Sequence, residues 1–324
     1  MIVKTDDGRW LAAAAALSER ARPSSRPNPG VGALIVSDGV VIARGWTQPG
    51  GRPHAEAMAL AAAGDAAQGA DLYVTLEPCA HRSERGPACA DLVAQAGLAR
   101  VVIGMRDPDP RTAGDGIARL QAERMDVAVA GLSAEKLGLT GHASAVNLGR
   151  PHITLKLALS LDGCLAMASG ESQWITGEEA RAHSHRERAR ADAILVGGGT
   201  LRADSPQLNV RLPGLEDRSP ERWVLTQRGA PDGWQALSSA QAVKDMEGVR
   251  YLFVEGGAKV AAAFLTEDLV DRLLIYRAPI LIGGGTPGVR DFGLERIAEA
   301  HDRWVLADRR QLGKDTLEIF NRTR

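Results

Sequence analysis

The sequence is poor in aromatic residues and cysteines, and its charges nearly cancel. Only 4% of its 324 residues are aromatic, which argues against the stacking surfaces that bind single-stranded nucleic acid. A formal net charge of −1 gives no reason to expect a polyanionic partner. Three cysteines are too few for a disulfide framework and favour a reducing compartment. We therefore expect a protein that binds no nucleic acid.

Long apolar runs are also missing near the amino terminus. The longest there, Trp10 to Leu17, is too short to cross a bilayer and has no basic segment before it. It predicts an alanine-rich first helix from Asp7 to Ala21 instead of a signal peptide. We therefore expect a cytoplasmic protein without a membrane partner.

The length and the order of elements predict two α/β domains. At 324 residues, 44% of them hydrophobic, the chain is long enough for two cores. Expected strands alternate with expected helices through the first half, which indicates layered α/β architecture. The glycines between residues 131 and 150 predict a connection, so we place the domains at residues 1–148 and 149–324.

A split motif in the first half predicts a metal site. Pro53-His54-Ala55-Glu56 is followed by Thr75-Leu76-Glu77-Pro78-Cys79 and by Pro87-Ala88-Cys89. One histidine and two cysteines suit zinc, and three protein ligands leave a fourth position for water. Zinc lowers the pKa of such a water to about 7. Glu56 is placed to move protons, a pattern found in zinc deaminases, although buried cysteines without a metal are the plainer alternative. His81 is a spare candidate ligand.

The first-half motifs resemble the cytidine-deaminase-like superfamily. The resemblance rests on Asn28-Pro29-Gly30-Val31-Gly32 together with the two segments that carry His54 and Cys79. The long gap between the cysteines, with Asp107-Pro108 later, is similar to the riboflavin-pathway pyrimidine deaminases. The resemblance implies an α/β/α layered domain, one zinc ion held by His54, Cys79 and Cys89, catalysis by Glu56 and substrate binding by Asn28. The loop from Ala80 to Ala88 departs from the usual order of that family.

Helix and strand signals continue in the second half. A threonine at position 176 with Glu179 three residues later predicts a capped helix that runs to about Arg190. We expect most of the charges on this helix to face solvent. Two buried strands run into Gly197-Gly198-Gly199-Thr200 and into Glu255-Gly256-Gly257, and a glycine-rich helix start can bind an anion. Neither run is a complete dinucleotide-binding fingerprint.

The second-half motifs resemble, as an ordered set, the reductase domain of the bifunctional riboflavin biosynthesis enzymes. The set comprises Lys156 to Gly163, Ser172 to Gly177, Asp192 to Thr200, Asp204-Ser205-Pro206 and Val254 to Gly257. That domain has a dihydrofolate-reductase-like α/β fold and uses NADPH. The resemblance implies that the cofactor contacts Ala158, Trp174, Thr200, Asp204, Gly257, Ala258, Lys259, Val260, Ala261, Ala262 and Ala263. It also implies that the phosphorylated substrate contacts Ser172, Arg188, Leu208, Arg211 and Glu255.

This half also departs from the family at two positions. Cys164 follows Asp162-Gly163 where the family has a cation, and Thr226 follows Val224-Leu225 where the family has an aspartate. The departure at Thr226 bears on the choice between NADPH and NADH.

Both halves together predict a bifunctional enzyme of riboflavin biosynthesis, and the family resemblance implies a homo-oligomer. Its expected steps are zinc-dependent deamination of a diaminopyrimidinone ribosyl phosphate and NADPH-dependent reduction of the ribosyl group. One alternative is a reductase whose zinc domain is structural. Another is a base or nucleoside deaminase with an unrelated second module, and a third is a non-enzymatic nucleotide-binding protein.

Overall fold

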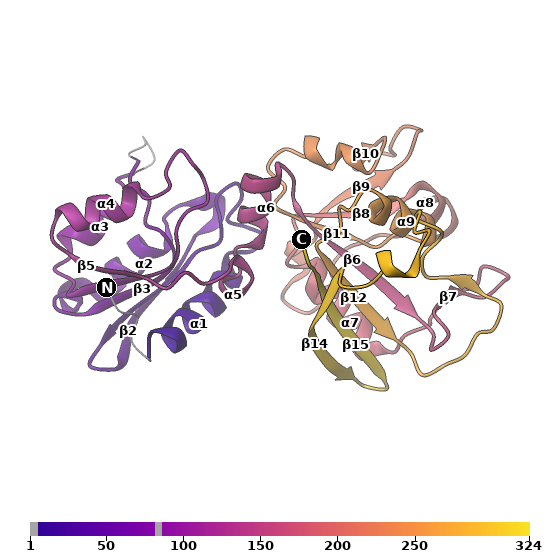
Figure 1. The fold of residues 1–324 in the computed structure, drawn as a ribbon, viewed down its shortest axis with the longest axis horizontal. Coiled ribbons are helices and arrows are strands. Elements are labelled where there is room, and N and C mark those ends of the chain that lie inside the picture. The colour runs from indigo at the N-terminus through magenta and orange to yellow at the C-terminus, as the bar shows by residue number, and fades with distance from the viewer. Residues whose placement is uncertain (1–5, 82–85) are drawn as a thin grey trace. The chain divides into compact units, whose positions relative to one another are not determined.

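The chain folds into two compact units, Met1–Gly149 and Arg150–Arg324. The structure is a computed structural model that describes residues 6–81 and 86–324 (Figure 1). The expected boundary between residues 148 and 149 lies one residue before the observed division. Residues 82–85, within the unusual loop between the two cysteines, lie outside the described residues.

The first unit is built on a five-stranded sheet of order β2-β1-β3-β4-β5. β1 is antiparallel to β2 and β3, whereas β3, β4 and β5 are parallel. The strands are β1 Gly32–Ser37, β2 Val40–Trp46, β3 Asp71–Leu76, β4 Arg100–Met105 and β5 Asp126–Val129. The helices are α1 Asp7–Ser18, α2 Ala55–Ala63, α3 Cys89–Gln95, α4 Asp115–Ala122, α5 Ala134–Leu137 and α6 Thr140–Leu148.

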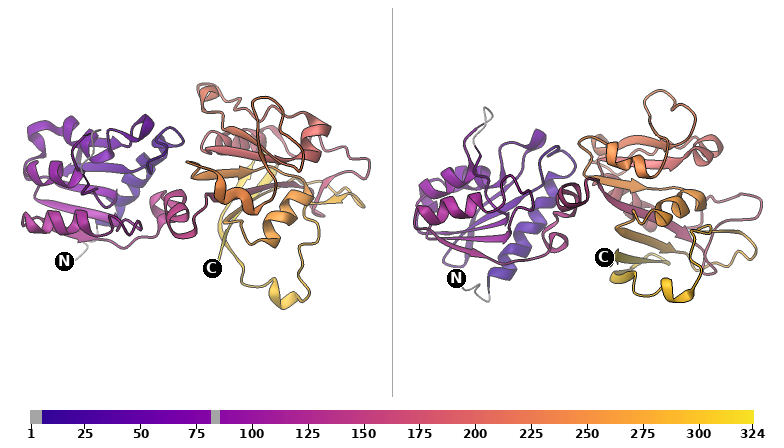
Figure 2. Two further views of the ribbon diagram at one scale, coloured as in Figure 1. Left: turned by 90° about the horizontal axis from the view of Figure 1, so that it is seen from above. Right: turned by 45° about the horizontal axis from the view of Figure 1, so that its top comes forward.

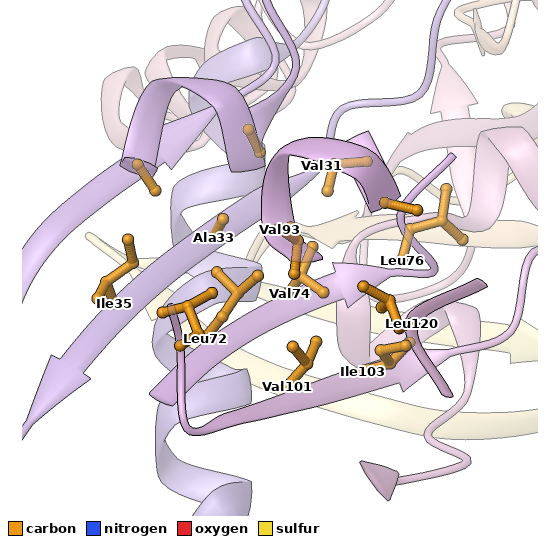
Figure 3. Close-up of a cluster of buried hydrophobic side chains, with 14 of the residues drawn as sticks. Val31, Ala33, Ile35, Leu72, Val74, Leu76, Val93, Val101, Ile103 and Leu120 are labelled. Atoms are coloured by element: carbon orange, nitrogen blue, oxygen red, sulfur yellow. The ribbon is translucent and has the colours of Figure 1, made fainter. Parts of the chain in front are cut away.

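Helices cover both faces of this sheet. On one face, α2, α3 and α4 contribute side chains to a core with alternate residues of β1, β3 and β4, such as Ala33, Leu72 and Val101 (Figure 3). On the other face, α1 packs Leu11 and Ala14 against the intervening residues of the same strands. The views of Figure 2 show helices on both sides of the sheet. The expected α/β/α layering is therefore confirmed.

A buried ion pair ties α1 to the sheet. Both carboxylate oxygens of Asp7 accept hydrogen bonds of 2.9 Å from the Arg100 guanidinium. The Tyr73 hydroxyl donates a third hydrogen bond to Asp7 over 3.1 Å. Because Asp7 is fully buried and Arg100 is 4% exposed, either charge would be left without solvent if its partner were removed.

Replacing Asp7 by asparagine should lower the free energy of unfolding by about 3–5 kcal/mol, the usual cost of breaking a buried ion pair. Urea denaturation followed by circular dichroism measures the change. Asp6→Asn is the matched control, because Asp6 makes an exposed ion pair of 3.6 Å with Arg9 and such pairs contribute about 0–1 kcal/mol. Equal effects of the two substitutions would contradict the importance of the buried pair.

The segment before the second unit is helical instead of a glycine-rich connection. α6 occupies Thr140–Leu148, and the glycines on either side of it, Gly138 and Gly149, have positive φ. These two glycines end helices, as left-handed residues commonly do, whereas Gly141 lies inside α6. The predicted connection ends at the division between the two units, but the sequence did not reveal α6, because its glycines were not recognised as the ends of short helices.

The second unit contains an eight-stranded sheet of order β10-β9-β8-β11-β6-β12-β15-β14. Neighbours from β10 to β12 are parallel, and β15 and β14 are added antiparallel. The strands are β6 His152–Leu159, β8 Ala193–Gly197, β9 Glu221–Leu225, β10 Gln235–Leu237, β11 Tyr251–Val254, β12 Arg272–Arg277, β14 Trp304–Leu312 and β15 Asp315–Arg322, with β7 Cys164–Ala166 and β13 Thr286–Pro287 in a separate ribbon. The helices are α7 Glu178–Arg188, α8 Gly198–Asp204 and α9 Ala258–Thr266.

Both faces of this larger sheet are also buried. Ala193 and Leu195 of β8 share a core with Val260 and Phe264 of α9. The intervening Ile194 belongs to a core on the opposite face, with Ala180 of α7 and Phe253 of β11. The parallel strands β6, β8, β9 and β11 end at one edge of the sheet, the place where α/β proteins bind their ligands.

Two predictions for α7 were wrong. The N-cap residue of α7 is Gly177, not Thr176, and no side chain caps this helix. The Gly177 N–H instead donates a hydrogen bond of 2.6 Å to the Asp315 carboxylate. Because these two residues are 138 positions apart in the sequence, local spacing does not reveal the contact. Most of the charges after the first turn do not face solvent freely: from residue 181 to 190 only Arg186 is exposed, and His185 and Glu187 are buried.

Within residues 6–81 and 86–324, none of the helices is sufficiently long and apolar to span a membrane.

Candidate active sites

Three candidate metal ligands converge at the ends of three elements in the first unit. His54 immediately precedes α2, Cys79 follows β3, and Cys89 is the first residue of α3. Their ligand atoms all lie within 4.8 Å of one another. The Nδ1 atom of His54 is 3.6 Å from the Cys79 sulfur and 3.3 Å from the Cys89 sulfur. The structure thus brings together the three residues that the sequence singled out.

These separations fit a tetrahedral zinc site. Zn–S bonds of about 2.3 Å and Zn–N bonds of about 2.0–2.1 Å place adjacent ligand atoms roughly 3.6 Å apart. A hydrogen bond with Cys89, together with one from His54, lowers the pKa of Cys79 to about 4 against the opposing effect of burial. This thiol is therefore a thiolate at neutral pH, the form that binds metals.

Glu56 lies beside this cluster in the first turn of α2. Its side chain is 3% exposed and hydrogen-bonds Cys89. Burial raises the pKa of Glu56 to about 7, although the neighbouring His54 ring opposes the shift. A carboxyl group with a pKa near the working pH can both accept and donate a proton, which is the property that a deaminase needs.

Asn28 contacts the His54 ring of this cluster. Its amide nitrogen is 3.2 Å from Nε2 of His54 and donates to the Gly51 carbonyl over 2.9 Å. Asn28 therefore contacts the imidazole nitrogen that faces away from the two sulfurs, a contact that sequence reasoning did not anticipate. His81 is exposed, and the ligand cluster found among the described residues does not include it.

A buried carboxylate two residues before Cys79 organises the neighbouring loop. Glu77 is 5% exposed and accepts hydrogen bonds from the backbone N–H groups of Asp107, Gly114 and Ile117 over 3.0–3.2 Å. It therefore caps α4 from a distant part of the sequence. Sequence reasoning missed this role because the three donors lie at least 30 residues from Glu77.

The second unit contains a cavity of about 480 Å³ at the carboxyl ends of β6, β8 and β11. All five residues expected to hold the substrate line it, as do five of those expected to hold the cofactor. These ten residues are Ser172, Arg188, Leu208, Arg211, Glu255, Ala158, Trp174, Thr200, Asp204 and Gly257.

The remaining expected cofactor residues lie along α9 and are not among the residues that line this cavity. They are Ala258, Lys259, Val260, Ala261, Ala262 and Ala263. The side chains of Val260 and Ala261 belong to the core beneath the sheet. Ala258 opens the first turn of α9, directly after Gly257.

An ion cluster gives the cavity its charge. Glu255 makes hydrogen bonds of 2.5 and 3.0 Å with Arg188, and its carboxylate is 3.6 Å from the Lys156 ammonium. Burial opposes ionisation of Glu255, but Arg188 and Lys156 outweigh it and lower its pKa to about 2. A carboxylate is thus held ionised at neutral pH between two cations.

Several cavity residues were missed from the sequence. Lys156, His185 and Tyr276 all line the cavity, and burial followed by the charges of Arg188 and Arg211 lowers the pKa of His185 to about 4. His185 was expected on a solvated face, and Tyr276 lies on β12, for which the motifs gave no signal.

The two sites define a class of protein, a zinc-dependent deaminase unit followed by a nucleotide-dependent reductase unit. Residues 4–105 match the family described as the cytidine and deoxycytidylate deaminase zinc-binding region. Residues 151–317 match the RibD C-terminal domain. Both halves of the chain therefore match families that agree with the observed sites.

Similar proteins extend over nearly the whole chain. The riboflavin biosynthesis protein RibD of Escherichia coli is 37% identical, covering 95% of this chain and 97% of that protein. The RibD of Aquifex aeolicus is 33% identical over 99% of this chain and 100% of that protein. A structure of Acinetobacter baumannii RibD has a TM-score of 0.87 and 34% identity, covering 98% of this chain and 99% of that one.

A solved structure from Thermotoga maritima is described as a diaminohydroxyphosphoribosylaminopyrimidine deaminase and 5-amino-6-(5-phosphoribosylamino)uracil reductase. It has a TM-score of 0.86 and 29% identity, covering 98% of this chain and 99% of that one. The chain belongs to the RibD family and is a bifunctional deaminase and reductase of riboflavin biosynthesis. Zinc and NADPH are its cofactors, and the alternative single-activity functions are not favoured.

Proposed function

We propose that this chain deaminates 2,5-diamino-6-(5-phosphoribosylamino)pyrimidin-4(3H)-one and then reduces the ribosyl group of the product to ribityl. The deaminase would occupy residues 1–148 and the reductase residues 149–324. One observation supports the proposal most strongly. A three-ligand zinc cluster with a buried glutamate and a charged cavity at a sheet edge lie in the same chain.

In the first step, Glu56 would be the catalytic residue. One zinc ion, held by His54, Cys79 and Cys89, supplies an activated water at neutral pH when it is bound. Glu56 takes a proton from that water and then gives a proton to the departing amine, so that ammonia is released. Asn28, which lies against His54, would orient the pyrimidine.

In the second step, the sheet-edge cavity of the second unit would hold both reactants. NADPH supplies the hydride for the ribosyl carbon when it is bound. Ala158, Trp174, Thr200 and Asp204 would contact its nicotinamide nucleotide. Gly257 suits the phosphates, because it is the N-cap residue of α9 and the free backbone N–H groups at a helix start favour an anion.

The substrate would be held by charge and by the walls of the same cavity. Glu255 accepts hydrogen bonds from ring N–H groups, and its ionised state makes those bonds stronger. Arg188 and Arg211 suit the phosphate, since a guanidinium presents several donors in a fixed plane. Ser172 and Leu208 would complete the wall.

Replacing Glu255 by glutamine should lower kcat/KM of the reductase about 10- to 100-fold. A hydrogen bond to a charged group contributes about 1.5–3 kcal/mol, which corresponds to that range. NADPH oxidation with 5-amino-6-(5-phosphoribosylamino)uracil measures the effect, and ammonia release by the same variant should be unchanged.

Glu187→Gln is the matched control for the Glu255 substitution. Glu187 is also buried and ion-paired, with Arg190 at 3.3 Å and Arg272 at 3.4 Å, but it is not among the residues that line the cavity. If both variants lose reductase activity equally, the loss reflects folding and the proposed role of Glu255 is wrong.

The remaining proposals concern partners and location. We propose a homo-oligomer that binds a small phosphorylated pyrimidine, no nucleic acid and no membrane, and that works in the cytoplasm. The near-zero net charge supports the absence of a nucleic-acid partner. Analytical ultracentrifugation of the purified protein tests the homo-oligomer, and a monomer at micromolar concentration would contradict it.

A further inference from the structure

Helix α7 forms one wall of the reductase cavity. Its residues Arg181, Ser184 and Arg188 all line the cavity. Ser184 comes three positions after Arg181 and four before Arg188, so the three side chains are neighbours on one face of the helix. Ser184 therefore lies between the two arginines on this wall.

The two arginines contact residues that belong to opposite parts of the proposed reaction site. The Arg181 guanidinium lies over the Trp174 ring, 4.9 Å from the ring centroid, and Trp174 is expected to contact the nicotinamide nucleotide. Arg188 forms hydrogen bonds of 2.5 and 3.0 Å with Glu255, which is proposed to hold the pyrimidine. Ser184 thus lies between the expected places of the two reactants, where the ribosyl group must receive the hydride.

The Ser184 side chain is buried without a hydrogen bond. The residue is 6% exposed, and within residues 6–81 and 86–324 no group forms a hydrogen bond with its hydroxyl. Among the described residues that line this cavity, it carries the single buried side-chain oxygen or nitrogen in that state. A buried hydroxyl without a partner destabilises a folded protein, so the stability of the free protein does not explain this serine.

The neighbouring polar side chains of α7 are already engaged. Arg181 donates a hydrogen bond of 2.6 Å to the Thr176 carbonyl. His185 accepts one of 3.3 Å from the Arg211 backbone N–H. Neither side chain contacts the Ser184 hydroxyl, which leaves this hydroxyl to a group that enters the cavity.

Helix propensity does not explain the serine either. Ser184 lies inside α7, where alanine is the better helix former because a serine hydroxyl competes for backbone hydrogen bonds. Ala180, one turn earlier on the same wall, is an alanine that is 1% exposed. An alanine is therefore compatible with the packing of this helix face, and the hydroxyl at position 184 requires another reason.

We propose that the Ser184 hydroxyl forms a hydrogen bond with a hydroxyl group of the substrate's ribosyl chain and thereby positions the ribosyl carbon beside the nicotinamide. The inference rests on the proposed placement of both reactants in this cavity. That placement assigns protein groups to the ring N–H groups and to the phosphate, but none to the sugar hydroxyls. A serine hydroxyl both donates and accepts, as a sugar hydroxyl does, so the two groups can satisfy each other.

Ser184→Ala should have opposite effects on stability and on ligand binding. Removing an unpaired buried hydroxyl in favour of the best helix former should raise the midpoint of thermal unfolding by about 2–4 °C. Loss of the hydrogen bond should raise the dissociation constant of the ribityl product about 3- to 10-fold. Calorimetric titration of the full-length protein measures that constant without turnover, and the dissociation constant of NADPH should stay at its wild-type value.

Ser144→Ala is the matched control. Ser144 is also a buried helical serine, in α6 of the first unit, whose hydroxyl has no partner among the described residues, but it is not part of the described lining of the cavity. It should raise the unfolding midpoint and leave product affinity unchanged. Unchanged product affinity in Ser184→Ala, or a loss of both stability and affinity, would overturn this inference alone. If wild-type protein bound neither NADPH nor the product, the proposed reductase site would be wrong as well.

Discussion

Replacing Glu56 by glutamine should leave zinc bound and lower the rate of ammonia release at least about 100-fold, the low end for a general acid–base group. Glutamine has almost the same shape as glutamate, so the cluster of His54, Cys79 and Cys89 should keep its geometry. It cannot take up and release a proton, however, and the buried position of Glu56 offers no easy substitute from bulk water. Steady-state ammonia release without NADPH measures the effect.

The same Glu56→Gln protein contains its own control in the second unit. Its reductase should oxidise NADPH at the wild-type rate when it is given 5-amino-6-(5-phosphoribosylamino)uracil, because the cavity of that step lies wholly in the second unit. Zinc content measured by atomic emission should remain one ion per chain. Retained ammonia release with full zinc content would show that Glu56 does not carry the protons.

Removing zinc should abolish ammonia release altogether while leaving the reductase active. Without the metal, water keeps a pKa of about 15.7 and is a poor nucleophile at neutral pH. The first unit has its own hydrophobic core, so we expect it to stay folded after chelation. Dialysis against a chelator, followed by parallel assays of both steps, tests this, and added zinc should restore deamination.

Cysteine substitutions test whether deaminase activity depends on the zinc ligands or on any cysteine of the chain. Cys79→Ser should lose zinc and deaminase activity. Cys164→Ser should keep both, since Cys164 is a buried free cysteine on β7 of the second unit and lies outside the ligand cluster. Deamination by zinc-free protein, or loss of zinc from the Cys164 variant, would contradict the assigned ligands.

The zinc site was predictable because short motifs specify it. His54 and Glu56 share one helix start, and each cysteine lies at an element end that could be read from local sequence. Distances between the ligands were not predictable, because they depend on how β3, α2 and α3 pack. The support from Glu77 was also hidden, since its three backbone partners lie at least 30 residues later, between β4 and the first turn of α4.

The reductase cavity was predictable only in part. The family resemblance supplied residues such as Arg188 and Glu255, but their ion pair is made between residues 67 positions apart. A run of charges on α7 reads locally as a solvated face, yet tertiary packing buries His185 and Glu187. The strands β12, β14 and β15 were not recognised from the sequence, so the contribution of Tyr276 on β12 was missed.

A two-stage assay tests the central claim most directly. Zinc-replete protein is first given 2,5-diamino-6-(5-phosphoribosylamino)pyrimidin-4(3H)-one without NADPH, and ammonia is measured until release stops. NADPH is then added, and its oxidation is followed. We predict one ammonia released per substrate in the first stage and one NADPH consumed per ammonia in the second. No ammonia from the intact protein in the first stage, or no NADPH oxidation in the second, would contradict the account.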